Sequence, residues 1–191
     1  NMPGVKKVAQ VGDSAVAVAA DTWWQAKTAL DALPIVWEES PNDKVSSASI
    51  AEWLKAGLDA SDNTFVGNQN GDAKDAIAKA AKKVEAVYAY PYQNHVCMEP
   101  MNATALYTAD RCQVWTPTQN GEAALAAASE AAGLPAAQCE VYKINLGGGF
   151  GRRGAFQDYV HQAVKIAKEM PGTPIKLLWS REEDMVQGRY H

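Results

Sequence analysis

The alternation of apolar and polar positions predicts a chain of mixed strands and helices. Residues 5–20 predict two short strands joined by a Gly-Asp turn. A helix follows from about residue 22 to residue 33, because apolar residues recur there at helical spacing until Pro34 ends the pattern. Residues 35–38 return as a strand, which completes a strand–helix–strand unit.

The pattern changes between residues 39 and 92. Residues 39–72 are rich in Ser, Asn, Asp and Gly, apart from a short amphipathic helix at 50–58, and residues 72–83 predict a lysine-rich, solvent-exposed helix. Residues 40–83 therefore predict a polar insertion or connector. Residues 84–92 predict a strand with three tyrosines on one face, and this change of pattern indicates a domain boundary.

Beyond this boundary, strand and helix signals alternate. The predicted strands cover residues 102–108, 111–116, 140–146 and 175–179, and the predicted helices cover 121–132 and 155–170. The predicted fold class is therefore α+β. We expect residues 1–90 to form one α+β unit that carries the polar insertion, and residues 91–191 to begin a second domain of mixed strands and helices.

Composition narrows the function classes. The 191 residues are 47% hydrophobic and 21% charged, as in an ordinary soluble domain, and the net charge of −4 argues against a nucleic-acid partner, which requires a basic face. No apolar run approaches the ~20 residues of a membrane span. The spacing of the three cysteines fits no zinc or iron–sulfur pattern, so no protein-ligated metal is predicted. Cys112 and Cys139 lie in apolar, strand-like stretches and are predicted to be buried.

The clearest candidate chemistry lies in the stretch Gly147–Gly154, which reads G-G-G-F-G-R-R-G. Consecutive glycines allow positive φ angles and let backbone N–H groups approach a ligand closely. The predicted helix that follows favours an anion at its start, and Arg152 and Arg153 add charges that bind phosphate. The stretch predicts an anion or phosphate cradle; the alternative is a glycine-rich turn with two solvated arginines.

A dinucleotide fold is a second interpretation of the same stretch. Gly149, Gly151 and Gly154 satisfy the G-x-G-x-x-G pattern between a predicted strand and a predicted helix. Acidic residues at 182–184 follow the next strand, where a ribose contact could lie. Against this interpretation, residues 140–145 are too polar for a central parallel strand, and Phe150 crowds the turn.

Four segments occur in a fixed order in the C-terminal half. They are Gln93–Glu99 (Q-N-H-V-C-M-E), Trp115–Asn120 (W-T-P-T-Q-N), Gly147–Arg153, and Arg181–Met185 followed by Gly188-Arg189. Together they resemble the large subunits of the molybdenum hydroxylases, the family of xanthine dehydrogenase and aldehyde oxidase. Residues 98–105 and the Arg-Arg pair are most similar to the isoquinoline 1-oxidoreductase β-subunit and membrane-bound aldehyde dehydrogenase branch. Residues 1–90 resemble the α/β hammerhead domain of this family without its first strand, and residues 91–191 the start of its molybdopterin-binding domain.

The resemblance implies an oxidoreductase that hydroxylates aldehydes or aromatic N-heterocycles with oxygen derived from water. It implies a molybdopterin-type molybdenum cofactor, in the cytosine dinucleotide form, that is held through its pterin and not by metal-ligating side chains. It also implies electron transfer to 2Fe–2S clusters in a partner subunit or domain.

The resemblance also assigns site residues. Gln93 matches the glutamine that hydrogen-bonds the apical oxygen of the metal. Phe150 and Gly151 match the part of the loop that packs against the metal centre. The pterin or phosphate side of the loop is matched by Gly147, Gly148, Gly149, Arg152 and Arg153.

Two departures limit the expected activity. Gly154 stands where many purine-oxidising members have a substrate-contacting glutamate, so the resemblance disfavours purines. It also places the general-base glutamate beyond residue 191, so no catalytic residue is assigned within the chain. We expect the chain to be a piece of a longer protein, as Asn1 before Met2 also suggests, and we expect this piece to be inactive alone. The alternative is a small non-enzymatic binding module. A bacterial periplasmic location is implied by the resemblance alone.

Overall fold

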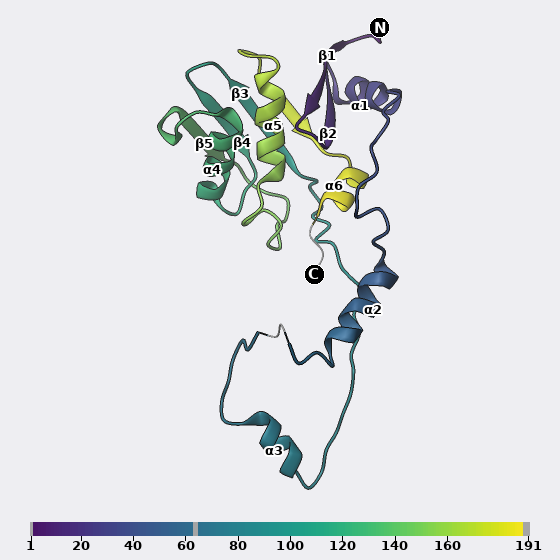
Figure 1. Cartoon of the computed structure of the whole chain (residues 1–191). Coiled ribbons are helices and arrows are strands. Elements are labelled where there is room, and N and C mark those ends of the chain that lie inside the picture. The colour runs from purple at the N-terminus through teal and green to yellow at the C-terminus, as the bar shows by residue number, and fades with distance from the viewer. Residues whose placement is uncertain (1, 63–64, 189–191) are drawn as a thin grey trace. The chain divides into compact units, whose positions relative to one another are not determined.

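The computed structural model describes residues 2–62 and 65–188 of the chain. The chain divides into two compact units, one formed by Asn1–Leu33 with Pro91–His191 and the other by Pro34–Tyr90 (Figure 1). Helices and strands are mixed, which confirms the predicted fold class. The assignment of residues 1–90 and 91–191 to two domains of a longer protein stays a prediction. Within the described ranges, no helix is long and apolar enough to cross a membrane.

The N-terminal part of the first unit is a hairpin followed by a helix, as predicted. Strands β1 (Val5–Val11) and β2 (Ala15–Ala20) pair antiparallel, and α1 covers Trp23–Asp31. Thr22 caps this helix: its hydroxyl accepts the N–H of Gln25, and the Gln25 side chain accepts the N–H of Thr22 in return. This reciprocal capping satisfies two N–H groups that the first helical turn leaves unpaired.

The remainder of the first unit is built on a four-stranded sheet. Its strands are β3 (Asn102–Tyr107), β4 (Cys112–Thr116), β5 (Cys139–Lys143) and β6 (Ile175–Leu178), in the spatial order β5-β4-β3-β6. Strand β3 is antiparallel to both β4 and β6, whereas β4 and β5 are parallel. Helix α4 (Gly121–Ala132) and the short 3-10 turn η1 (Ala136–Gln138) connect β4 to β5, and α5 (Asp158–Lys168) precedes β6.

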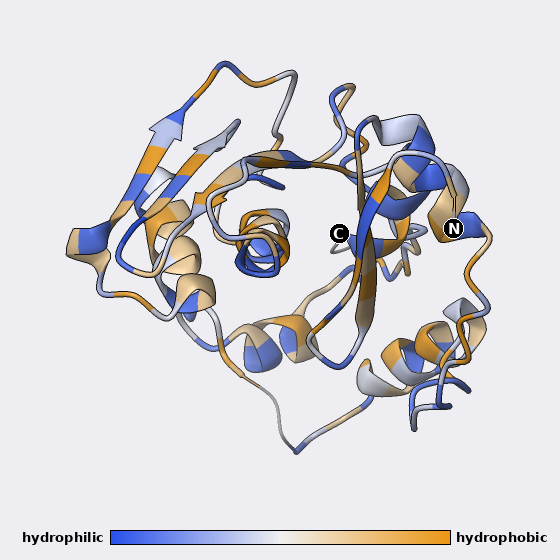
Figure 2. Ribbon diagram, turned by 90° about the horizontal axis from the view of Figure 1, so that it is seen from above, coloured by the Kyte–Doolittle hydropathy of each residue, from blue (hydrophilic) through white to orange (hydrophobic). Residues whose placement is uncertain are grey.

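Helix α5 forms the centre of the core. Tyr159, Val160, Ala163, Val164 and Ala167 recur at helical spacing, and all five are fully buried. Their faces pack on β3 and on α4, and each large apolar side chain contributes about 1.5–3 kcal/mol of burial free energy. Viewed from above, α5 is seen end-on between the sheet with α4 and the β1–β2 hairpin (Figure 2).

Cys112 and Cys139 are also part of this core, as predicted. They are paired residues on the parallel strands β4 and β5, and both are buried as free thiols. Burial raises the pKa of the Cys112 thiol to about 11, and the neighbouring Cys139 raises it further.

The sheet topology excludes the dinucleotide interpretation. A dinucleotide-binding unit needs the strand before the glycine loop and the strand after the helix to be parallel neighbours. Here β5 and β6 lie at opposite edges of the sheet, separated by β4 and β3, and β3 is antiparallel. The residues at 182–184 lie in a further helix, α6 (Arg181–Gln187), and not at a strand end.

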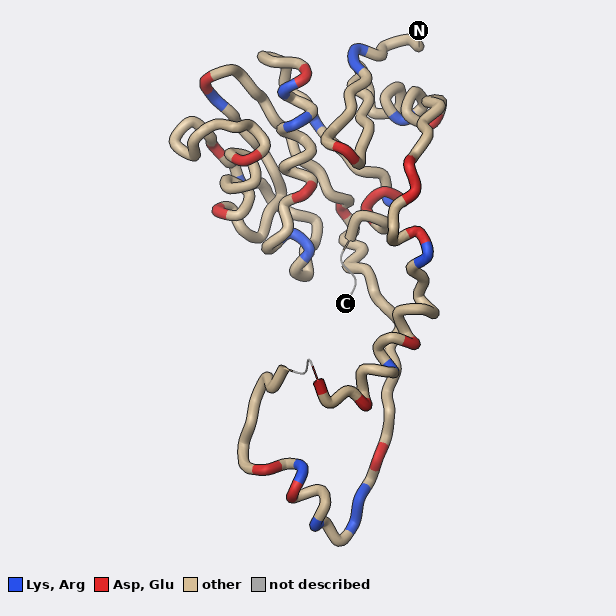
Figure 3. The backbone as a smooth tube through the Cα atoms, viewed as in Figure 1, with Lys and Arg blue, Asp and Glu red and all other residues tan. Residues whose placement is uncertain are grey.

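The described residues of the second unit form helices and bury little. Helices α2 (Ser47–Gly57) and α3 (Ala73–Lys79) have no buried residue. The strands predicted at 35–38 and 84–92 do not form, and that prediction was wrong: Val36 and Val84 are 94% and 96% exposed. A strand is stable only when a neighbour pairs with its backbone, and the described residues supply none. Charges of both signs are interspersed along both units (Figure 3).

Candidate functional site

The loop between β5 and α5 has a backbone shape that few residue types adopt. Gly148 and Gly151 have φ angles of 100° and 99°, in the left-handed region that favours glycine. Phe150 lies between them with a φ of 54°, which costs a non-glycine residue about 1–2 kcal/mol, and its side chain is 76% exposed. An exposed aromatic residue on strained backbone marks a candidate site and not a simple turn.

The backbone N–H groups of the loop fall into two sets. Those of Gly147 and of residues 151–154 donate to acceptors inside the protein. Those of Gly148, Gly149 and Phe150 have no acceptor in the described part of the chain. Of these residues Phe150 is exposed, Gly148 is half-buried and Gly149 is buried. Three consecutive unpaired donors can bind an oxygen-rich or anionic group.

The Arg153 side chain holds the loop from the inside. It is fully buried, and it donates to the carbonyls of Gly148 at 2.9 Å, Pro117 at 3.2 Å and Glu99 at 2.6 Å. It also forms an ion pair with the Glu99 carboxylate at 3.0 Å. This geometry differs from the expected phosphate cradle, because all of these acceptors belong to the protein.

Arg152 is likewise engaged within the protein. Its side chain is 4% exposed and forms two hydrogen bonds to the Asp158 carboxylate, at 3.0 and 2.9 Å. Its guanidinium carbon lies 5.6 Å from the centre of the Trp179 ring. Helix α5 begins at Asp158 and not directly after Gly154, so a carboxylate already occupies the helix start where an anion was expected.

Close approach of two side chains disfavours a Cβ at two further glycines. A Cβ at Gly147 would lie 2.7 Å from Cβ of Glu99, and a Cβ at Gly149 would lie 2.5 Å from Cδ of Gln119. Gln119 Oε1 accepts the N–H groups of Gly151 at 3.1 Å and of Arg153 at 3.2 Å. The loop therefore wraps around these two side chains.

Helix α6 holds the segment that contains Glu99 in place. Arg181 of α6 donates to the carbonyl of Cys97 and, at 3.1 Å, to that of Met98. Its second nitrogen pairs with the buried carboxylate of Asp184 at 2.8 Å. Burial raises the pKa of the Asp184 carboxyl, and Arg181 opposes this shift. The Cys97 thiol in turn donates to the carbonyl of Gly149 at 3.4 Å.

The four segments that carry the resemblance thus meet around one loop. Glu99 and Cys97 come from the first segment, Gln119 from the second and Arg181 from the fourth, and each contacts the glycine loop or the backbone beside it. Arg189, which belongs to the fourth segment, lies outside the described residues.

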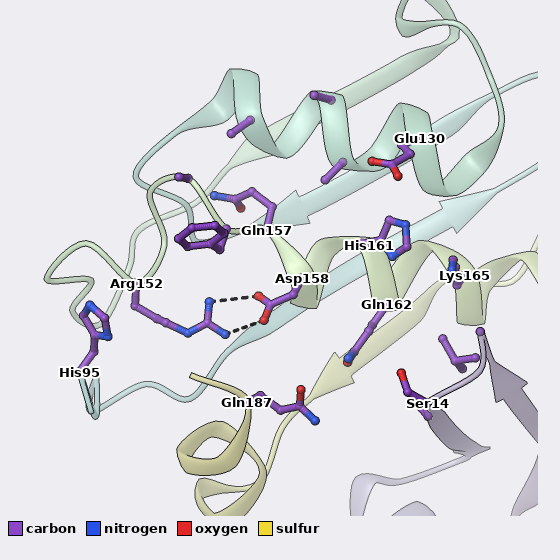
Figure 4. Close-up of a pocket in the computed structure, with 18 of the residues that line it drawn as sticks. Ser14, His95, Glu130, Arg152, Gln157, Asp158, His161, Gln162, Lys165 and Gln187 are labelled. Atoms are coloured by element: carbon purple, nitrogen blue, oxygen red, sulfur yellow. Dashed lines mark hydrogen bonds and ion pairs between the residues drawn. The ribbon is translucent and has the colours of Figure 1, made fainter. Parts of the chain in front are cut away.

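An open cleft of about 1110 Å³ adjoins the loop. Residues 150–152 and His95 line it together with faces of α4, α5 and the β1–β2 turn (Figure 4). His161 of α5 also lines the cleft; burial, and then the nearby Lys165, lower the pKa of its imidazole. Figure 4 shows the Arg152–Asp158 pair at the same end as His95.

The structure separates the two glutamines of these segments. Both glutamines are exposed, and neither is among the residues that line the cleft. Gln119 lies against the loop, and its Nε2 group has no acceptor in the described ranges. Sequence reasoning named neither Gln119 nor Glu99 as a site residue, although both lie in segments that carry the resemblance.

The residues present fit a group that is bound through backbone contacts. The loop offers three unpaired N–H groups, and any side chain at Gly148 would be strained by its φ angle and meet the Phe150 ring at 3.2 Å. The described residues contain no cluster of three or more His, Cys, Asp or Glu side chains that could hold a metal. A metal held by an organic cofactor is compatible with this donor set.

Comparison with known proteins identifies the class. Residues 58–190 match the molybdopterin cofactor-binding domain family, and the chain belongs to this family. It is 27% identical over 189 residues to a subunit of the nicotinate dehydrogenase of Pseudomonas putida, covering 97% of this chain and 15% of that protein. It is 28% identical over 182 residues to the xanthine dehydrogenase molybdenum-binding subunit of Escherichia coli O157:H7, covering 90% of this chain and 23% of that protein. The chain thus spans less than a quarter of these relatives.

A third relative is similar over most of the chain, and a solved structure shares its fold. The membrane-bound aldehyde dehydrogenase of Gluconacetobacter polyoxogenes is 26% identical over 177 residues, which cover 92% of this chain and 23% of that protein. Quinoline 2-oxidoreductase from Pseudomonas putida 86 has the same fold over 98% of this chain and 29% of its own, with a TM-score of 0.72 and 18% sequence identity.

Proposed function

We propose that the chain is part of the molybdenum-cofactor-binding subunit of an oxidoreductase, and that its glycine loop contacts the cofactor through backbone. The observation that carries this proposal is the set of unpaired N–H groups at Gly148, Gly149 and Phe150, on a loop held open by positive φ angles. Membership of the cofactor-binding family supplies the identity of the bound group.

Gln119 is proposed as a second glutamine that contacts the cofactor from the protein side, in addition to the Gln93 that the resemblance assigns. The carbonyl of its amide is occupied by two loop N–H groups, so its Nε2 hydrogens remain for an acceptor beside the loop. Gln93 has no such contact with the loop, and its role stays an open prediction from the resemblance. Arg152 and Arg153 are proposed to act indirectly, by holding the loop in place.

The cofactor supplies the redox chemistry, in which oxygen from water is added to an electron-poor carbon. The chain supplies placement: unpaired N–H groups and the Gln119 amide orient the bound group, and Phe150 lines the adjoining cleft. Hydrogen-bond donors fixed in advance stabilise developing negative charge without reorganisation.

The substrate class proposed is an aldehyde or an aromatic N-heterocycle, with electrons passed to 2Fe–2S clusters of a partner subunit or domain and a cytosine dinucleotide form of the cofactor. Named relatives include a nicotinate dehydrogenase and an aldehyde dehydrogenase, which supports both substrate types, and also a xanthine dehydrogenase subunit. Gly154, at the position of the purine-contacting glutamate, continues to disfavour purines.

The test is purification of the full-length parent with elemental analysis and a substrate panel. We expect about one molybdenum per polypeptide and oxidation of an aldehyde or an N-heterocycle such as nicotinate or quinoline. The 191-residue chain alone should carry no stoichiometric molybdenum and oxidise neither class. A parent without molybdenum would contradict the proposal, and a parent that oxidises only purines would contradict the substrate class.

A further inference from the structure

We propose that Glu99 is a positioning residue that sets the shape of the glycine loop, through Arg153, before any cofactor binds. The relevance of this shape for the cofactor rests on the proposed function above. The geometry itself is independent of the cofactor and can be tested without it.

The Glu99 carboxylate joins the two ends of the loop. Its Oε2 accepts the N–H of Gly147 at 2.8 Å and a guanidinium hydrogen of Arg153 at 3.0 Å. Its Oε1 accepts the side-chain amide of Asn102 at 2.9 Å, which ties it to the start of β3. The carboxylate is therefore held on one side by the sheet and binds both loop ends on the other.

The backbone of Glu99 repeats the same contact. Its N–H donates to the carbonyl of Gly147 at 3.2 Å, and its carbonyl accepts from Arg153 at 2.6 Å. Gly147 is consequently bound by both the main chain and the side chain of Glu99. The 2.7 Å approach of a Cβ at Gly147 to Cβ of Glu99 shows that no larger residue fits there.

The buried charge of Arg153 favours one arrangement of the loop over others. Arg153 is fully buried, and Glu99 is its ion-pair partner in the described part of the chain; Asp184 contributes a second, more distant negative charge. Removing the partner of a buried guanidinium strongly destabilises the folded state. Turning Arg153 outward would also remove the donors to the carbonyls of Gly148 and Pro117. One loop arrangement is therefore favoured over alternatives.

The consequence for the site is preorganisation. With both loop ends fixed by Glu99 and Arg153, the N–H groups of Gly148, Gly149 and Phe150 stay unpaired and in a defined place. A loop that is ordered before binding loses less conformational entropy when its ligand arrives.

The experiment is amide hydrogen exchange on the 191-residue chain, followed in peptides that cover residues 144–156. Glu99→Gln keeps an acceptor for the Gly147 N–H but removes the negative charge beside Arg153. We expect the protected loop amides to exchange roughly 10²-fold faster, while β3 and α5 keep their protection. Glu99→Asp, which keeps the charge on a shorter stem, should restore part of the protection.

Two controls separate positioning from general destabilisation. Glu122→Gln makes the same chemical change at an exposed position of α4 and should leave loop exchange unchanged. Ala163→Gly removes a buried methyl group from α5 and should lower the melting temperature without opening the loop selectively. The inference would be overturned if loop exchange in Glu99→Gln stayed within twofold of that in Glu122→Gln. It would also be overturned if Ala163→Gly, with the same melting temperature as Glu99→Gln, opened the loop equally.

A double variant keeps the test valid if Glu99→Gln does not fold. Glu99→Gln with Arg153→Gln removes both charges, so the chain should fold while the loop still exchanges fast. Protection of the loop at the wild-type level in this variant would overturn the inference. Molybdenum content of the parent tests the proposed function separately: a parent without molybdenum refutes that function and leaves the exchange result standing.

Discussion

Replacing Gly149 with alanine tests how Gln119 holds the loop. The added Cβ would lie 2.5 Å from both Cδ and Oε1 of Gln119. Because these atoms end a flexible side chain, the amide can move away, but it then gives up the N–H groups of Gly151 and Arg153. The φ angle of Gly149 is outside the left-handed region, so backbone strain does not contribute.

The expected magnitude follows from the two lost hydrogen bonds. At about 1 kcal/mol each, the loss is about 2 kcal/mol, or about 4–8 °C in melting temperature for a chain of this size. Thermal unfolding followed by circular dichroism measures the shift. The control is Gly121→Ala at the start of α4, where nothing lies within 4 Å and alanine favours the helix. A Gly149→Ala melting temperature equal to that of Gly121→Ala would refute the reasoning.

In the parent, Gln119→Ala and Gln93→Ala should each retain molybdenum but lower turnover by roughly 10²-fold. In steady-state assays, unchanged turnover of Gln119→Ala would contradict its proposed contact, and unchanged turnover of Gln93→Ala would contradict the role that the resemblance implies. Burial holds the pKa of Cys112 at about 11 against 9.0 when exposed, so the unfolded chain ionises first and stability falls as pH rises from 9 to 11. Urea titrations at pH 8 and 11 should show a smaller fall for Cys112→Ala, and an unchanged fall would argue against this linkage. Asp158→Asn weakens the partner of the buried Arg152 and should lower the free energy of unfolding, measured by urea titration, by about 1–2 kcal/mol; no change would mean that the pair adds no net stability.

Elements whose signals are local were predictable from sequence. Helix α1 is marked by its Thr22 cap and helical apolar spacing, and α4 by its Asn120 cap and the left-handed Gly133 at its end. The β3–β4 hairpin likewise shows apolar alternation on either side of a short turn. In each case the stabilising contacts lie within a few residues of one another, so a sequence window contains them.

Whether a strand-like segment finds a pairing partner was not predictable. Residues 35–38 and 84–92 have the composition of strands, but no strand pairs with them in the described structure. An alternating pattern indicates a surface suited to a half-buried strand and does not show what covers it. The predicted helix at 155–170 also began too early, because α5 starts at Asp158.

The site was predictable in part for the same reason. Successive glycines reveal the loop, because positive φ angles such as those of Gly148 and Gly151 restrict the residue type. The partners of the loop are 48 residues away at Glu99 and 32 residues away at Gln119, so no local pattern reveals them. The burial of Arg153 could not be predicted from the sequence either. An arginine beside glycines can bind an exposed phosphate or form hydrogen bonds inside the protein.

The central claim is that the backbone of the glycine loop contacts the molybdenum cofactor, and molybdenum content tests it most directly. Gly148→Ala and Gly172→Ala both place alanine at a positive φ, 100° and 79° respectively, so both carry similar backbone strain. Only Gly148 belongs to the loop; a Cβ at Gly172 meets nothing within 4 Å. Elemental analysis of the full-length parent should show that Gly148→Ala loses most of its molybdenum while Gly172→Ala retains it. Equal molybdenum in the two variants would contradict the claim.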